Sequence, residues 1–276
     1  MGLGQILKQQ DPDTAAAEFR TAIALDPTRA DIPRILGTVL YKQHNFADAV
    51  VETRKSIELN PDDAETYNNL SVLLLGQSRQ DEALLAARKA LDLDPKLSAG
   101  HNALGNILLA QGNPEAAAAE FRTALELDPD NAAAHANVGA QLYGQHRYDE
   151  ALAENRLAVE LDPTQAEPHN GLGENLEALH KTGEAIAEYK KAIALDPLAA
   201  DAHNNLCLVF REQGRLDEAF VECSRAVELD PSAAGAHNSL GWVLEDQGKR
   251  DEGMAEYRRA IELDPKLAYA HNNLGK

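Results

Sequence analysis

The sequence is poor in aromatic residues, basic residues and cysteine, and each shortage limits the kind of core, partner or covalent framework that the protein can have. Aromatic residues make up 5% of the chain, so its core has to be built from Ala, Leu, Ile and Val, a palette that favours helices. Lys and Arg number 26 against 45 Asp and Glu, and the net charge of −19 argues against nucleic acid and against anionic membrane surfaces as partners. Two cysteines cannot form a disulfide framework.

Targeting segments and catalytic motifs are also missing. No apolar run approaches the length of a membrane span, and no charged N-terminal segment precedes an apolar stretch, so we expect a cytoplasmic protein. The chain has no serine–histidine–aspartate set, no zinc-protease motif and no phosphate-binding loop. Gly2-Leu3-Gly4 and Gly171-Leu172-Gly173 faintly resemble a dinucleotide loop, but neither follows a predicted strand. We predict neither enzymatic activity nor a cofactor or metal.

What the sequence does have is an internal repeat. Eight prolines lie 34 residues apart, at Pro27, Pro61, Pro95, Pro129, Pro163, Pro197, Pro231 and Pro265. A strict period of this length predicts stacked supersecondary units in place of one globular core. We number each repeat from 1 to 34, with the proline at position 32. One array over residues 1–276 then consists of a partial repeat at 1–29, full repeats at 30–63, 64–97, 98–131, 132–165, 166–199, 200–233 and 234–267, and a truncated repeat at 268–276.

Each repeat reads as two helices. In repeat 98–131, His101, Leu104, Gly105 and Leu108 follow the i, i+3, i+4, i+7 spacing of one helix face, and a second such face follows a short loop. A loop this short predicts an antiparallel helical hairpin. Small residues at positions 8, 20 and 27 allow the helices to approach closely, and Gly or His at position 15 predicts a left-handed residue that ends the first helix.

The pattern at positions 4, 7, 8, 11, 20, 24, 27 and 32 resembles the tetratricopeptide repeat over the whole chain. The resemblance implies an all-α superhelix of stacked antiparallel helix pairs whose first helices line a concave groove. It also implies a polar capping helix at the end of an array. None is present here, so we expect the chain to be a piece of a longer protein.

In this family, positions 2, 5, 6, 9, 12 and 13 of the first helix face the groove. Asparagine dominates position 5 and alternates with other residues at position 6. Its amide both donates and accepts hydrogen bonds, which suits the backbone of an extended peptide, although a plain solvated surface is the alternative. The expected groove residues are Asn68, Asn69, Leu75, Asn102, Leu109, Asn137, Tyr143, Asn170, Glu174, Glu177, Asn204, Asn205, Arg211, Asn238, Trp242 and Asp246.

The later repeats place acids on this face. Arg211 is the one base expected there, so we predict a protein or peptide partner with a basic segment. The alternative is that these acids only keep the protein soluble. The acids are Glu167, Glu174, Glu177, Asp201, Glu212, Glu245 and Asp246.

Two known functions within the family can be compared with this sequence. Members that clamp the C-terminal carboxylate of chaperones use basic residues at positions 2, 5 and 6. This chain has no basic residue at position 6, and most of its repeats have Ala, Asp, Glu or Gly at position 2. We therefore exclude that clamp. Members that transfer O-linked N-acetylglucosamine carry an Asn ladder ahead of a catalytic region. We predict a non-catalytic interaction scaffold, and the alternative is the repeat arm of such a glycosyltransferase whose catalytic region is absent from this chain.

The histidines and cysteines could suggest more specific functions. Position 4 is His in six repeats (His101, His135, His169, His203, His237 and His271), which could suggest a metal ladder. Stacked helices lie about 8–10 Å apart, however, too far for neighbouring rings to share one zinc ion, so we predict a role in helix packing. Cys207 and Cys223 face inward in one repeat and could bridge, but we expect free buried thiols.

Overall fold

The computed structural model describes residues 12–275. Within that range the chain forms α-helices and no strand, which confirms the predicted all-α class. In chain order the helices are α2 (Pro12–Leu25), α3 (Asp31–Lys42), α4 (Phe46–Leu59), α5 (Ala64–Gly76), α6 (Gln80–Leu93), α7 (Ser98–Ala110), α8 (Pro114–Leu127), α9 (Ala132–Gly144), α10 (Tyr148–Leu161), α11 (Ala166–Ala178), α12 (Thr182–Leu195), α13 (Ala200–Glu212), α14 (Leu216–Leu229), α15 (Ala234–Asp246), α16 (Arg250–Leu263) and α17 (Ala268–Leu274).

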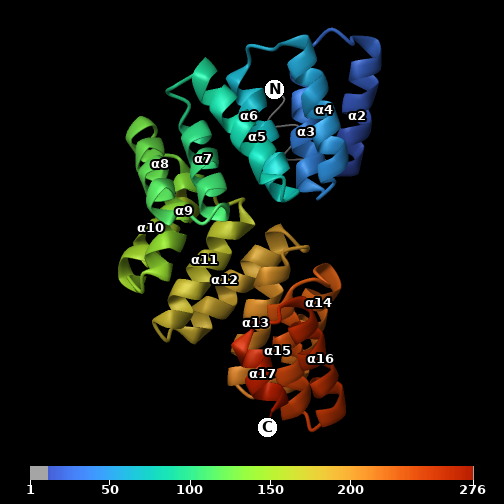
Figure 1. Cartoon of the computed structure of the whole chain (residues 1–276), viewed down its shortest axis with the longest axis vertical. Helices are drawn as coiled ribbons and strands as arrows, with labels where there is room; N and C mark the ends of the chain where they lie inside the picture. Colours follow the sequence, from blue (N-terminus) through green and yellow to red (C-terminus); the bar gives the residue numbers. More distant parts are fainter. Residues whose placement is uncertain (1–11, 276) are drawn as a thin grey trace. The chain divides into compact units, whose positions relative to one another are not determined.

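The helices belong to two compact units, Met1–Asn137 (unit 1) and Val138–Lys276 (unit 2). Odd-numbered helices are the first helices of their repeats, and even-numbered helices are the second. In unit 1, α5 packs against α6 and α7 against α8, while in unit 2, α11 packs against α12, α13 against α14 and α15 against α16. Figure 1 shows these hairpins stacked pair after pair within each unit. The predicted stacking of helical pairs is therefore confirmed.

Within residues 12–275, every turn from a first to a second helix contains one residue in the left-handed region, as position 15 predicts. Gly adopts this conformation without steric strain, and His is among the residues that tolerate it. Its backbone N–H bonds a carbonyl of the ending helix, as His44 does to Tyr41 at 2.9 Å. The residues are His44, Ser78, Gly112, His146, His180, Gly214 and Gly248.

The turn to the next repeat is built by Asp and the anchor proline. Asp94 ends α6 in an extended conformation (φ −136°, ψ 94°), which the following proline favours. Its carboxylate accepts the backbone N–H of Lys96 at 2.9 Å, an Asx turn that helps stop the helix. The same bond forms at Asp128, Asp162, Asp196, Asp230 and Asp264.

Glycine at position 8 makes room for a ring at position 24. Tyr189 on α12 is completely buried against α11, and a methyl group added to Gly173 would lie 2.5 Å from its ring. Gly105 faces Phe121 in the same way, and Gly241 faces Tyr257. The prediction that only a small residue fits position 8 agrees with this geometry in these repeats.

In repeat 200–233, two cysteines occupy the positions that glycine and an aromatic ring fill in other repeats. Cys207 of α13 and Cys223 of α14 occupy positions 8 and 24, both fully buried, and form a disulfide with their Cα atoms 5.3 Å apart. The expectation of free thiols is therefore wrong. Two cysteines replace the glycine and the ring of the neighbouring repeats, and the close approach of the helices that glycine permits elsewhere brings their sulfurs together. Cysteine usage consequently gives no support to a reducing compartment.

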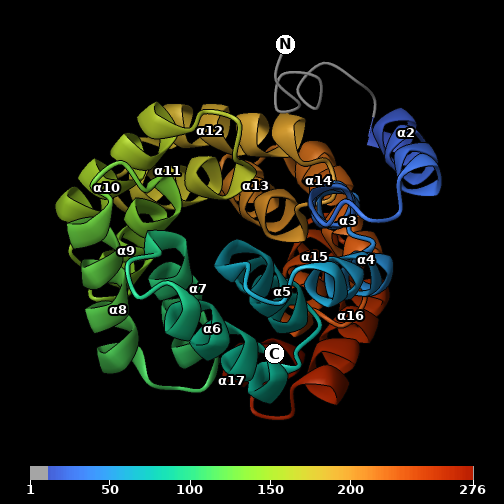
Figure 2. The ribbon, with the colours of Figure 1, turned by 90° about the horizontal axis from the view of Figure 1, so that it is seen from above.

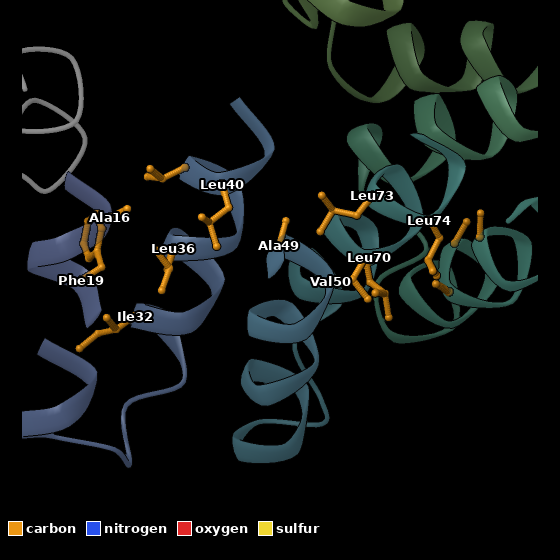
Figure 3. Packing of buried hydrophobic residues seen from close by; sticks show 14 of the residues in the cluster. Ala16, Phe19, Ile32, Leu36, Leu40, Ala49, Val50, Leu70, Leu73 and Leu74 are labelled. Atoms are coloured by element: carbon orange, nitrogen blue, oxygen red, sulfur yellow. The ribbon is translucent and has the colours of Figure 1, made fainter. Parts of the chain in front are cut away.

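Each unit has its own apolar core. In unit 1, Phe19, Leu36, Val50 and Leu74 belong to one buried cluster that runs from α2 to α7 (Figure 3). In unit 2 the cluster runs from Leu152 to Leu244. Across residues 12–275, no helix combines the length and the apolar character that crossing a membrane requires. The Gly2-Leu3-Gly4 motif lies outside the described residues.

Candidate functional site

The candidate site is the face that the first helices present at positions 2, 5, 6, 9, 12 and 13, which we call the first-helix face. Residues three or four apart on a helix lie on the same side, so these positions form one strip per helix. Within unit 1, α3, α5 and α7 contact one another in sequence, and within unit 2, α11, α13, α15 and α17 do the same. Figure 2 shows α11 and α13 side by side, with α12 in the other layer.

Asparagines of this face pair across neighbouring repeats. In unit 1, Asn137 donates from Nδ2 to Oδ1 of Asn102 at 2.8 Å. In unit 2, Asn205 bonds Asn170 at 3.2 Å and Asn273 bonds Asn238 at 3.1 Å. Each pair joins position 6 of one repeat to position 5 of the repeat before it. This pairing gives a structural role to the asparagines at position 6 of these three repeats, which the sequence pattern alone did not reveal.

Two asparagines at position 5 lack such a donor. The Oδ1 atoms of Asn68 and Asn204 are buried without a hydrogen-bond partner among the described residues. Position 6 of the following repeat is Ala103 in one case and Ser239 in the other, where the paired repeats have Asn. The unpaired oxygens therefore follow from the loss of the partner amide.

Glu174 lies on α11 beside one of the asparagine pairs. Its Oε1 accepts hydrogen bonds from Nδ2 of Asn170 at 3.0 Å and from Nδ2 of Asn205 at 2.9 Å. Burial raises the pKa of this carboxyl, and the charges of Asp201 and Glu167 add to the rise, while the two amide bonds oppose it. No base in the described part of the chain contributes to the balance, so the Glu174 carboxylate has no countercharge there.

A buried tyrosine holds the next carboxylate. Tyr189 donates its hydroxyl to Oε2 of Glu177 at 2.8 Å, and Tyr257 donates to Glu245 at 2.9 Å. Burial raises the pKa of Glu177, the bond from Tyr189 lowers it, and the charges of Glu212 and Glu174 raise it again. The sequence carried a signal for this contact that we missed, because Glu occurs at position 12 in both repeats that have Tyr at position 24.

Arg211 is already engaged. Its Nε lies 2.7 Å from Oδ2 of Asp246, and its guanidinium carbon lies 4.7 Å from the ring centre of Trp242. A guanidinium over an indole ring gains cation–π attraction, and the carboxylate adds an ion pair. Asp246 is thus neutralised within the chain, whereas Glu174 and Glu177 are held by uncharged donors.

The other expected residues form none of the hydrogen bonds described above. Leu75 packs against the core of unit 1, Asn69 is half-buried and Leu109 is 36% exposed. In unit 2, the ring of Tyr143 lies 5.4 Å from that of Tyr148. Burial and the charges of Glu174 and Glu177 raise the pKa of the Tyr143 hydroxyl.

The six histidines at position 4 form hydrogen bonds within the chain. His169 Nδ1 lies 2.7 Å from Glu188 Oε2, and both side chains are largely buried. His101 contacts Glu120 at 2.7 Å and the carbonyl oxygen of Pro95 at 3.1 Å, so its ring links the second helix of its repeat to the preceding turn. No cluster of three or more metal-ligating side chains occurs within residues 12–275. His135, His169, His203 and His237 are buried, in agreement with the predicted packing role, while His101 is partly buried and His271 is exposed.

Stacked antiparallel helix pairs with a 34-residue repeat define a helical solenoid. A family model described as tetratricopeptide repeat matches residues 7–53, 36–98, 102–166 and 170–234, and a second one, described as TPR repeat, matches residues 243–276. The chain therefore belongs to the tetratricopeptide repeat family, as the sequence predicted.

Solved structures show the same fold at low sequence identity. A chain of the crystal structure of the APC/C hetero-tetramer Cut9-Hcn1 superposes with a TM-score of 0.80 and 16% identity, covering 96% of this chain and 54% of that one. Pseudomonas aeruginosa pilF superposes with a TM-score of 0.60 and 22% identity, covering 76% of this chain and 95% of that one. The chain thus spans about half the length of the first of these structures. No curated protein matches its sequence.

Proposed function

We propose that this chain is a non-catalytic interaction scaffold that binds extended segments of protein partners along its first-helix face. Repeats of this family generally serve protein interaction. The first-helix face of each unit combines ordered amides with apolar or acidic side chains, and among the described residues it gathers no metal-ligating cluster.

The orientation of the paired asparagine amides is the observation that carries the proposal. In the pair Asn102–Asn137, the position-6 amide donates to the position-5 oxygen. This leaves the oxygen of Asn137 and the NH₂ group of Asn102, which together offer an acceptor and a donor. A peptide group needs one of each. The pair Asn238–Asn273 has the same orientation, but both side chains are buried, so we assign the peptide contact to the Asn102–Asn137 pair of unit 1.

Unit 2 favours a segment that contains Lys or Arg. Glu174 and Glu177 are buried enough to raise their pKa, and neither is paired with a base. A cation from the partner would take the position beside them that Arg211 takes beside Asp246. Such a charge pair forms on a partly desolvated face, where it gains more than on an open surface.

Trp242 is the single tryptophan of the chain and lies on this face, so its fluorescence can report binding. We expect acetyl-(Lys-Ala)₆-amide to change the emission saturably, and acetyl-(Glu-Ala)₆-amide to have no effect. Binding of the basic peptide should weaken as ionic strength passes about 0.15 M, where the screening length is about 8 Å.

A charge-neutral double variant tests the site. Glu174→Gln with Glu177→Gln keeps the acceptor oxygens and removes both charges, so it should weaken the basic peptide severalfold. Glu126→Gln with Glu160→Gln is the matched control, because both glutamates are exposed on second helices. Equal effects of the two double variants would show that only net charge attracts the peptide. The glycosyltransferase alternative rests on the sequence resemblance alone, and no contact described above favours it.

A further inference from the structure

A cleft in unit 1 lies away from the first-helix face, between the second helices α4 and α6 and over α5. Its volume is about 250 Å³, the size of one or two side chains. Leu70, Leu74 and Ala86 form a buried apolar floor, and Leu85 on the rim is 67% exposed. Leu70 and Leu74 appear in Figure 3, on α5. The complete lining is Arg54, Tyr67, Leu70, Leu74, Glu82, Leu85, Ala86 and Lys89.

Two substitutions distinguish the repeat that forms this cleft. In other repeats a histidine at position 4 reaches a glutamate at position 23, as His101 reaches Glu120 and His203 reaches Glu222. Repeat 64–97 has Tyr67 at position 4 and Ala86 at position 23. An alanine cannot bridge to the first helix, so this repeat lacks the His–Glu contact.

The rim is more basic than the chain as a whole. Arg54 of α4 reaches Glu82 of α6 at 3.3 Å, and Arg79 bonds the same carboxylate at 2.6 and 2.7 Å. Lys89 Nζ stands 6.0 Å from the ring centre of Tyr67. Two cations and one carboxylate line the cleft in a chain whose net charge is −19, so its local charge is complementary to an acid.

Four repeats later, unit 2 builds a similar cleft of about 300 Å³ from equivalent positions. Lys190, Phe210, Glu218 and Val221 stand where unit 1 has Arg54, Leu74, Glu82 and Leu85. The unit 2 cleft also takes Asp217 and Glu222 into its lining, so acids outnumber its single base. At position 22, Leu85, Val221 and Val51 of repeat 30–63 are exposed apolar residues, whereas repeats 98–131, 132–165, 166–199 and 234–267 have Ala119, Ala153, Ala187 and Ala255.

We propose that the cleft between α4 and α6 is a docking site for a partner segment in which a branched aliphatic side chain is adjacent to Asp or Glu. The aliphatic side chain fills the space above Leu70, Leu74 and Ala86 and covers Leu85. The neighbouring carboxylate pairs with Lys89 or Arg54. A single anchor in an apolar pocket with a charged rim is how small interfaces concentrate their binding energy. The site uses second helices and is independent of the function proposed for the first-helix face.

A random dodecapeptide library displayed on phage tests the proposal. The wild-type chain is the bait, and depletion uses Leu85→Lys, which alters an exposed side chain and should leave the thermal midpoint unchanged. We expect the enriched peptides to share Leu, Ile or Val beside Asp or Glu. Their synthetic forms should bind the wild type at least tenfold more tightly than Leu85→Lys. Failure to enrich any peptide that distinguishes the two proteins overturns the proposal.

Two further variants separate the parts of the site. Lys89→Glu should shift the selected peptides from acidic to basic neighbours of the aliphatic residue, and an unchanged selection contradicts the charge argument. Val221→Lys, the matched change in unit 2, should leave binding of the selected acidic peptides unchanged. Sedimentation identifies the other occupant: a concentration-dependent dimer that Leu85→Lys abolishes would assign the cleft to a second copy and reject a partner segment.

Discussion

The hydroxyl of Tyr189 donates a hydrogen bond of 2.8 Å to Oε2 of Glu177, and thereby connects a fully buried ring to a carboxylate on the first-helix face. Tyr257 and Glu245 repeat this relationship in the same unit. The ring fills the space that glycine leaves on the first helix, and the hydroxyl fixes the carboxylate. Packing and the chemistry of the face are therefore coupled through one side chain.

Removing the Tyr189 hydroxyl tests this coupling. Tyr189→Phe keeps the packing and should lower the free energy of unfolding by only about 0.5–1.5 kcal/mol. The pKa of Glu177 should rise further, since the bond from Tyr189 lowers it. Urea unfolding and carboxyl ¹³C NMR measure the two effects. The converse variant Phe121→Tyr buries a hydroxyl opposite Leu109, which accepts no hydrogen bond, and should be the more destabilising change. An unchanged Glu177 pKa in Tyr189→Phe would contradict the coupling.

Glycine at position 8 gives a second prediction. Gly173→Ala places a methyl group 2.5 Å from the Tyr189 ring and should destabilise unit 2 by about 1–3 kcal/mol. Gly183→Ala in α12 is the control, because nothing lies within 4 Å of the added methyl. Gly183 is the second residue of α12, so the change should stabilise the protein by less than the about 0.5–1 kcal/mol of a helix interior. Urea midpoints that move in the same direction would show that the ring yields to the methyl group.

The sequence predicted those parts of the fold that follow from spacing along the chain. The proline period sets the repeat, the apolar spacing sets the helices, and position 15 sets the turn at His44, Gly112 and their equivalents. Each of these depends on residues within one repeat. Within a repeat, local backbone preference and burial favour the same helices and turns, so the sequence pattern predicts them.

The contacts between side chains of different helices were not predictable in the same way. The bond from Asn137 to Asn102 and that from Tyr189 to Glu177 depend on rotamers and on helix stacking. The sequence indicates such contacts only through residues that occur together at fixed positions of the repeat. We noticed that Tyr at position 24 occurs with Glu at position 12 only after the structure had paired them. The disulfide was missed because compartment, and not distance, decided our expectation for Cys207 and Cys223.

Acidity provides a third prediction. Glu174 and Glu177 have pKa values raised above the ordinary 4.5, so the native state takes up protons at a higher pH than the unfolded chain does. Their effect on stability is therefore unfavourable at neutral pH and disappears as the pH falls through the raised pKa values toward 4.5. Carboxyls with lowered pKa, such as Glu82 beside Arg79, act in the opposite sense and at lower pH.

The double variant Glu174→Gln with Glu177→Gln isolates this effect. It should be more stable than the wild type at pH 7, because the two desolvated charges are gone while their hydrogen-bond acceptors remain. Its advantage should shrink as the pH falls through the raised pKa values of the two wild-type carboxyls toward 4.5. Urea midpoints of both proteins across this range measure the difference. A difference that does not change with pH would mean that the raised pKa values do not contribute to stability.

The disulfide gives the last prediction. Cys207 and Cys223 are separated by 16 residues, and closing a loop of that size stabilises a folded chain by about 3 kcal/mol in the chain-entropy model. Reduction under unfolding conditions, followed by refolding with the thiols kept reduced, should therefore lower the urea midpoint of unit 2. The double variant Cys207→Gly with Cys223→Phe rebuilds the glycine–ring packing of Gly105 and Phe121. It should lose the dependence on reductant and recover part of the stability, because the ring fills the volume left by the two sulfurs. Cys207→Ala with Cys223→Ala provides the contrast, since it removes the bridge and leaves the space unfilled. If the two double variants unfold at the same midpoint, packing at positions 8 and 24 does not substitute for the bridge.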